Sequence, residues 1–184
     1  AIEIAKGPAR TPIGEMLDAR VFVNGMVGLC ATGGSTNLTI HLVAMAKAAG
    51  LTLDWDDFAA ISAVTPLLVR AYPNGRADVN GFRDAGGMPF LVRELIGVGL
   101  LHDDVTTVAG PGLAAYTRTP ELDADGRLVF AETVAASRDR DVVRPAAEPF
   151  RPTGGLELVT GNLGRAIVKS SAIADAHMVV EAPA

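Results

Sequence analysis

The sequence has little cysteine, few aromatic residues and no excess of basic residues. Its 184 residues include a single cysteine, Cys30, and only 5% are aromatic. One cysteine excludes an intrachain disulfide framework and any metal site built only from cysteines of this chain. It also favours a reducing compartment, the cytoplasm. The 16 Lys and Arg against 21 Asp and Glu give a net charge of −5, which argues against nucleic-acid binding, because phosphate contacts need a basic surface.

Long hydrophobic runs are absent as well, so the sequence predicts no membrane-spanning helix and no membrane partner. The richest apolar stretch, 38–51, is short and contains His41 and Lys47. Apolar residues nevertheless make up 49% of the chain, which is enough to exclude a disordered protein. The sequence begins at Ala1 and ends in the short apolar run 178–184. We therefore expect an excerpt from a longer globular protein.

The first part of the chain, 1–113, is predicted to be mostly helical. Hydrophobic spacing and end signals, with Asp54 as an N-cap and Gly50 and Gly99 as stops, indicate helices at 15–27, 38–49, 55–64, 79–85 and 88–98. The helix at 38–49 has little polar face, so we expect it to be buried. Residues 73–75 (Pro-Asn-Gly) predict a turn, and the β-branched segment 105–109 predicts a strand.

The character of the sequence changes after the first part. Residues 114–152 are polar and rich in proline, with one strand-like piece at 128–130, and indicate a linker or a long surface crossing. Strands are then predicted at 156–159, 166–170 and 178–181, with a turn at 161–164. The last unit, 153–184, is too small to be an independent β domain. The predicted class is therefore α/β: a helical part of one domain, a crossing, and the start of a β-rich domain.

The segment Gly33-Gly34-Ser35-Thr36-Asn37 is the clearest candidate binding site, because it stands directly before a predicted helix. Glycines allow close backbone approach, and a helix start offers unpaired N–H groups and a positive dipole end, which suit a carboxylate or a phosphate. The alternative is structural: the glycines make a turn and Ser35 or Thr36 caps the helix. The segment is not a P-loop, since no lysine follows the glycines at the required position.

Few other residues suggest chemistry. Arg76 follows the predicted turn, with Asp78 and Asn80 close by; this is either a phosphate contact or a solvated turn. Cys30 lies among apolar neighbours and is interpreted as a buried structural thiol. The sequence shows no complete catalytic apparatus.

Several separated motifs give the chain a specific resemblance. Residues 27–42, which include Gly33-Gly34-Ser35-Thr36-Asn37, are similar to the GGSTN segment of the dihydroxy-acid and phosphogluconate dehydratase family. Further similar segments follow in the family's order, at 72–80, 85–95, 99–105, 154–156 and 161–166. The resemblance covers nearly the whole chain, is weakest at 120–148, and is strongest to the phosphogluconate branch of the family.

This resemblance implies a hydro-lyase, whose reaction in the phosphogluconate branch is loss of water from 6-phospho-D-gluconate to 2-dehydro-3-deoxy-6-phospho-D-gluconate in the Entner-Doudoroff pathway. It implies an iron–sulfur cluster, optionally with a divalent cation, as Lewis acid for the departing 3-hydroxyl. It also implies that 1–113 belongs to an N-terminal α/β domain, 114–152 to a linker, and 153–184 to the start of a swivelling β-barrel domain. The intact enzyme would be a homodimer or a larger homo-oligomer.

The family's cluster cysteines precede the GGSTN segment, and its metal-binding glutamate and proposed serine base lie further on, in the β domain. By resemblance, then, these 184 residues carry no catalytic or metal-binding residue, bind no cluster alone, and are inactive alone. The expected contacts to a phosphorylated sugar acid are Gly33, Gly34, Ser35, Thr36 and Asn37, with Arg76 and Asn80 as weaker candidates for the phosphate. Two alternatives stay open: another sugar-acid or dihydroxy-acid dehydratase of the same family, and a non-catalytic anion-binding or interaction module.

Overall fold

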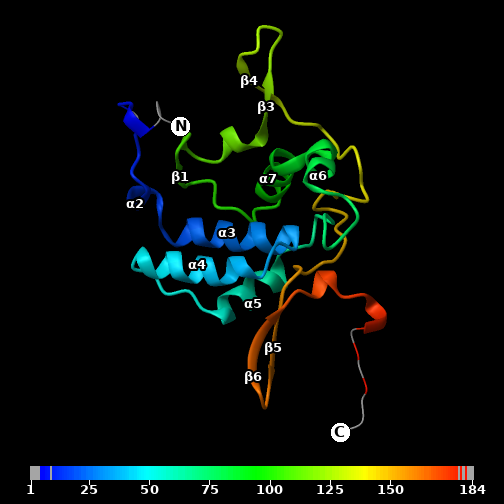
Figure 1. The fold of residues 1–184 in the computed structure, drawn as a ribbon. Helices are drawn as coiled ribbons and strands as arrows, with labels where there is room; N and C mark the ends of the chain where they lie inside the picture. The colour runs from blue at the N-terminus through cyan, green and yellow to red at the C-terminus, as the bar shows by residue number, and fades with distance from the viewer. Residues whose placement is uncertain (1–4, 9, 178, 180, 182–184) are drawn as a thin grey trace.

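The computed structural model describes residues 5–8, 10–177, 179 and 181. Figure 1 shows a body of helices from which two β-hairpins project, one at the top and one at the bottom of the view. The α-helices are α2 (Ile13–Met16), α3 (Ala19–Thr32), α4 (Asn37–Ala48), α5 (Trp55–Val64), α6 (Val79–Ala85) and α7 (Gly87–Gly97). The strands are β1 (Thr106–Thr107), β2 (Gly110–Pro111), β3 (Arg118–Leu122), β4 (Leu128–Glu132), β5 (Glu157–Gly161) and β6 (Gly164–Val168). Short 3₁₀ helices are η1 (Ala114–Thr117), η2 (Ser170–Ala172) and η3 (Asp175–His177).

Helix α3 is the centre of the body, and its predicted bounds were wrong at both ends. It begins four residues later than predicted because Asp18 caps it, with the carboxylate accepting a hydrogen bond from the backbone N–H of Val21 at 3.2 Å. It continues five residues further because Gly25 and Gly28 do not interrupt it. A Cβ on Gly25 would lie 3.3 Å from the side chain of Leu42 in α4, so glycine serves close helix packing there.

Helix α4 forms where predicted, but the expectation that it is buried was wrong. Thr39, Leu42 and Ala46 are its buried residues, while Ile40 is 65% exposed and Met45 is 46% exposed. The helix packs against α3, and in the view of Figure 1 it lies alongside α3 with α5 on its other side. The apolar composition of a helix indicates which of its residues could be buried. Whether they are buried depends on the neighbouring elements that pack against the helix.

The predicted helices at 55–64 and 79–85 are confirmed, and the one at 88–98 is confirmed with a shift of one residue. Asp54 caps α5 as predicted, and Asp57 completes a capping box by accepting a hydrogen bond from the Asp54 N–H at 2.9 Å. Among the described residues, no helix is long and apolar enough to cross a bilayer.

Two groups of apolar side chains form the core. One lies between α3 and α7 and includes Val27, Phe90, Leu91 and Leu95; the other lies between α3, α4 and α5 and includes Phe22, Met26, Leu29, Leu42 and Phe58. The segment 67–71 is extended. Its backbone forms isolated bridges with the later residues Val143 and Arg151 and thereby closes the first group of core side chains.

The segment predicted as a linker or surface crossing, 114–152, is only partly at the surface. Val142 and Val143 are 7% and 0% exposed and belong to the core beside α7. The segment also contains the antiparallel hairpin β3–β4. The strand-like piece at 128–130 is confirmed as part of β4, whereas Pro120 and Glu121 concealed its partner β3. The predicted strand at 105–109 is reduced to the two residues of β1, paired with β2.

The predicted hairpin at the end of the chain is confirmed as β5–β6, with its turn between Gly161 and Gly164. The third predicted strand, 178–181, includes positions outside the described residues. Within the described part of the chain the sheets are three separate antiparallel pairs. Helices combined with small antiparallel sheets agree with the predicted α/β class.

Candidate functional site

The first residues of the Gly33–Asn37 segment end helix α3. Gly33 has a left-handed backbone (φ 55°, ψ 44°), and its N–H donates to the carbonyl of Cys30 at 3.2 Å. The N–H of Gly34 donates to the carbonyl of Leu29 at 3.0 Å. Together these bonds form a Schellman motif, which explains the glycine at position 33. The two glycine N–H groups are therefore already paired within the chain.

The remaining residues of the segment begin helix α4. The hydroxyl of Ser35 accepts a hydrogen bond from the N–H of Asn37 at 3.2 Å, and the Ser35 carbonyl accepts one from Leu38 at 3.0 Å. The N-cap residue of α4 is Thr36, whose side chain makes no cap hydrogen bond. The predicted structural alternative is therefore met only in part, by the hydroxyl of Ser35 one residue earlier. The side chains of Ser35 and Asn37 are exposed, so side chains, rather than unpaired glycine N–H groups, are what this segment offers to a ligand.

Asn74 fastens this segment to two other parts of the chain. It lies in the predicted turn, directly after the cis Tyr72–Pro73 peptide bond. Its amide nitrogen donates to the carbonyls of Gly33 at 2.7 Å and Thr32 at 3.2 Å, and its amide oxygen accepts from the Ser171 hydroxyl at 3.1 Å. One side chain therefore connects the end of α3, the turn and helix η2.

Gly154 and Gly155 lie just before hairpin β5–β6 and contact the ends of α3 and α5. The N–H of Gly155 donates to the carbonyl of Cys30 at 3.2 Å, and the N–H of Gly154 donates to the carbonyl of Ser62 at 2.8 Å. A Cβ on Gly155 would lie 2.7 Å from the Cα of Gly33, so no larger residue fits without displacement. We call the group Gly33, Asn74, Gly154, Gly155 and Ser171 the glycine junction.

Arg76 and Asn80 lie beside the turn, and no hydrogen bond among the described residues joins them to the glycine junction. Arg76 and Asn80 are both exposed. Asn80 donates to the carboxylate of Asp78 at 3.4 Å. Asp78 caps α6, and the hydrogen bond from the Gly81 N–H, assisted by Asn80, lowers the pKa of its carboxyl group. The assignment of Arg76 and Asn80 to the substrate phosphate stays a prediction.

Comparison with known proteins places these motifs in a family. A sequence profile described as "Dihydroxy-acid/6-phosphogluconate dehydratase N-terminal" matches residues 2–116, and the corresponding C-terminal profile matches residues 141–184. The chain belongs to the dihydroxy-acid/6-phosphogluconate dehydratase family. The glycine junction is where the two matched regions meet, because Gly33 and Asn74 come from the first and Gly155 and Ser171 from the second.

Individual relatives agree with the family. The chain is 55% identical over 172 residues to the phosphogluconate dehydratase of Pseudomonas aeruginosa and 54% identical over 173 residues to that of Escherichia coli K12, in both cases over 94% of this chain. It is 39% identical over 149 residues, 81% of this chain, to a dihydroxy-acid dehydratase of a Roseiflexus species. The chain spans only 28% of the length of the first two relatives and 24% of the third.

Cys30 does not fit the role of a ligand in the iron–sulfur cluster that the resemblance to this dehydratase family implies. Its side chain is fully buried, and burial raises the pKa of its thiol to about 11, against a weaker opposing hydrogen bond with Ser62. Among the described residues, no three His, Cys, Asp or Glu side chains gather as a metal site would require. The prediction of Cys30 as a buried structural thiol is confirmed.

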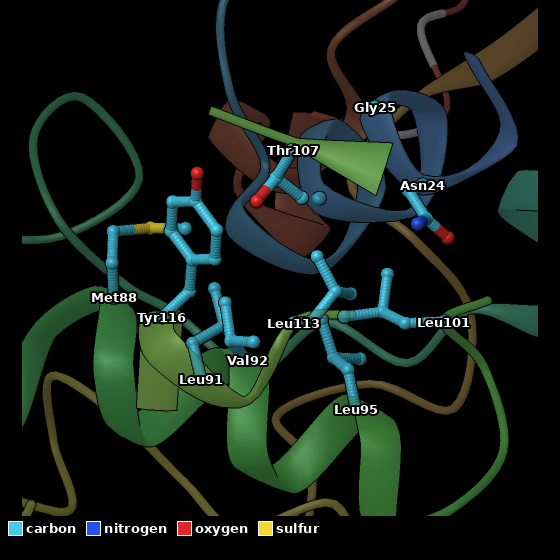
Figure 2. Close-up of a pocket in the computed structure, with 11 residues that line it drawn as sticks. Asn24, Gly25, Met88, Leu91, Val92, Leu95, Leu101, Thr107, Leu113 and Tyr116 are labelled. Atoms are coloured by element: carbon cyan, nitrogen blue, oxygen red, sulfur yellow. The ribbon is translucent and has the colours of Figure 1, made fainter. Parts of the chain in front are cut away.

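Two cavities differ in the chemistry they could serve. The first, of about 270 Å³, lies between α3, α7 and η1 and is shown in Figure 2, where Leu91, Leu95, Leu101 and Leu113 surround it and Met88 lies beside Tyr116. None of its described lining residues carries a charge, so it does not suit an anionic sugar acid.

The second cavity, of about 410 Å³, adjoins the glycine junction and is lined by Arg70, Asn74, Arg151 and Ser171 among others. No sequence pattern pointed to Arg70 or Ser171, and Asn74 was indicated only as a turn residue. Their grouping depends on contacts between positions about 40 and 100 residues apart.

Proposed function

We propose that this chain is a segment of a phosphogluconate dehydratase, which removes water from 6-phospho-D-gluconate to give 2-dehydro-3-deoxy-6-phospho-D-gluconate. The higher identity to proteins named phosphogluconate dehydratase than to the dihydroxy-acid dehydratase supports this branch of the family. The observation that carries the proposal is the convergence of the GGSTN segment, the Pro-Asn-Gly turn and the later Gly-Gly pair at one junction beside a polar cavity.

In this proposal the segment binds and orients the substrate and does not perform the chemistry. The reaction removes the proton next to the carboxylate and the hydroxyl at carbon 3, and the resulting enol becomes the ketone. The cavity beside the junction offers guanidinium groups, and the exposed side chains of Ser35 and Asn37 offer a hydroxyl and an amide. Such groups hold anionic and hydroxylated ligands. Side chains of Ser35 and Asn37, at the start of α4, would contact the sugar acid, with Arg76 and Asn80 further out.

The remaining parts of the enzyme are also proposals. An iron–sulfur cluster, with or without a divalent cation, would be held by residues outside this segment and would supply Lewis-acid chemistry. The hairpin β5–β6 would be the first part of a swivelling β-barrel domain. The intact enzyme would act in the cytoplasm, in the Entner-Doudoroff pathway, as a homodimer or larger homo-oligomer.

The test is an anaerobic assay of the full-length protein that contains this segment. We expect water loss from 6-phospho-D-gluconate, iron and sulfide in the purified protein, and no turnover by residues 1–184 alone. Preferential turnover of a branched-chain 2,3-dihydroxy acid would replace the proposed substrate. An iron-free protein without dehydratase activity would overturn the proposal in favour of an anion-binding module.

A further inference from the structure

We propose that the polar cavity beside the glycine junction is the binding site for the phosphate group of the substrate, with the guanidinium of Arg70 as its principal cation. The nature of the ligand, a phosphorylated sugar acid, rests on the proposed function. The location of the site is argued from three observations. Arg70 has no acidic partner among the described residues, the cavity lining contains no acidic residue there, and the cavity adjoins the Gly33–Asn37 segment.

Arg70 is a cation without a counter-charge among the described residues. Its guanidinium makes no hydrogen bond or ion pair there, and it lies over the ring of Phe150 at 4.6 Å from the centroid. Most other arginines of the described chain pair with carboxylates: Arg20, Arg83, Arg93, Arg118, Arg127, Arg140 and Arg165. In a chain of net charge −5, an unpaired arginine beside a cavity marks a place for an anion.

The backbone and the aromatic ring hold Arg70 in place. The N–H of Arg70 donates to the carbonyl of Val142 at 2.8 Å, and the N–H of Phe150 donates to the carbonyl of Leu67 at 2.9 Å. The guanidinium of Arg144 also lies over the Phe150 ring, at 4.3 Å from its centroid. Because the ring is held by these contacts, the Arg70 guanidinium is presented on a fixed surface, which reduces the entropy lost when it binds a ligand.

The cavity has the size and lining that a phosphate needs. Its volume is about 410 Å³, and none of its described lining residues is acidic. Arg151, which donates to the Ser170 carbonyl at 3.4 Å, adds a second positive charge to the lining. Arginine suits this role because its planar guanidinium can donate two parallel hydrogen bonds to phosphate oxygens.

Three side chains connect the cavity with the GGSTN segment. A Cβ added to Gly33 would meet Asn74, Ser171 and Leu67 within 3.1 Å, and the same three residues line the cavity. A phosphate beside Arg70 would therefore be separated from Gly33 only by these three side chains. The rest of a six-carbon acid would then extend along the segment toward Ser35.

The experiment compares Arg70→Met, Arg70→Lys and Arg83→Met in the full-length protein. Arg83 is the control because it is an exposed arginine paired with Asp84 on α6, away from the lining of this cavity. We expect Arg70→Met to raise KM for 6-phospho-D-gluconate by roughly tenfold or more with kcat within about twofold, because a contact to a non-reacting group contributes to binding. Arg70→Lys should recover part of this loss, and Arg83→Met should change neither constant.

Inorganic phosphate gives a readout that does not need turnover. It should protect Arg70 from modification by phenylglyoxal, measured by peptide mass spectrometry, while chloride at equal ionic strength should not. If the wild-type protein does not dehydrate 6-phospho-D-gluconate but phosphate still protects Arg70, the proposed function fails and the anion site stands. Unchanged KM in Arg70→Met, or no protection by phosphate, would overturn the site itself.

Discussion

The hairpins β3–β4 and β5–β6 are both antiparallel pairs of five-residue strands, but they are attached to the helical body in different ways. In β5–β6, Leu156 just before the first strand is 2% exposed and packs with α3 and α5, and Ile167 of β6 packs against the same core. In β3–β4, Leu122, Leu128 and Phe130 are 72%, 60% and 48% exposed. A two-stranded hairpin has little stability of its own. The comparison therefore indicates that the residues flanking a hairpin decide whether it becomes part of the body.

Hydrogen bonds from the body hold β3–β4 at its base. Arg93 of α7 donates to the carbonyls of Val134 at 2.7 Å and Ala135 at 3.1 Å, just beyond β4. The strands above this point project from the body in Figure 1. Hydrogen bonds at the base orient the hairpin, whereas Leu156 fastens β5–β6 by burying an apolar side chain.

Removing the buried side chain should give the largest effect. Leu156→Ala should lower the local opening free energy of β5–β6 by about 3 kcal/mol, because it leaves a cavity between α3 and α5. Leu122→Ala in the exposed hairpin should change the corresponding value by less than about 0.5 kcal/mol. Hydrogen exchange of the strand amides in the full-length protein measures both. Equal effects in the two hairpins would contradict the comparison.

Filling the glycine junction should be nearly as costly. Gly155→Ala would place a Cβ 2.7 Å from the Cα of Gly33 and 2.6 Å from the hydroxyl of Ser171. We expect a loss of about 2 to 3 kcal/mol in the same exchange measurement. Gly161→Ala is the matched control, since nothing lies within 4 Å of its added Cβ. If both variants behave like wild type, the close packing of the junction has been overstated.

Cys30 supports the attachment of Gly155 and should give a pH-dependent effect. Burial raises the pKa of its thiol from 9.0 to about 11. The neutral thiol is therefore favoured in the folded state, and the stabilisation is complete below pH 9 and lost between pH 9 and about pH 11. It amounts to roughly 3 kcal/mol. Alkylation of Cys30, followed by mass spectrometry, should remain slow at pH 9, and Cys30→Ala should abolish this part of the pH dependence. Rapid alkylation at pH 8 would contradict the assignment.

The smallest effect is expected at the surface contact of β5–β6 with α5. Arg165 in β6 forms an ion pair with Asp56, and both side chains are well exposed. Solvent screening limits such pairs, so Arg165→Met should lower the opening free energy by about 0.5 kcal/mol or less. The difference from wild type should disappear in high salt, which hydrogen exchange at two salt concentrations can test. A loss as large as that of Leu156→Ala would mean that charge, rather than burial, attaches the hairpin.

How much of the structure could be predicted depended on whether a feature was local. The cap Asp54, the turn around Asn74 and the hairpin between Gly161 and Gly164 form from neighbouring residues, and a pattern of neighbours is sufficient to predict them. Beta pairing across Pro120 was missed because proline and a charged neighbour weaken the strand pattern. The expected burial of α4 was wrong because burial depends on what lies opposite a helix.

The sequence by itself determined the family, most of the helices and the hairpin at the end of the chain, because these follow from short-range preferences and from motifs in a fixed order. Only the tertiary structure decided that Asn74, Gly155 and Ser171 meet Gly33, and that Arg70 lies beside a cavity without a carboxylate partner among the described residues. Those contacts join residues roughly 15 to 100 positions apart. No local preference encodes them, because they exist only once the two regions pack against the same end of α3.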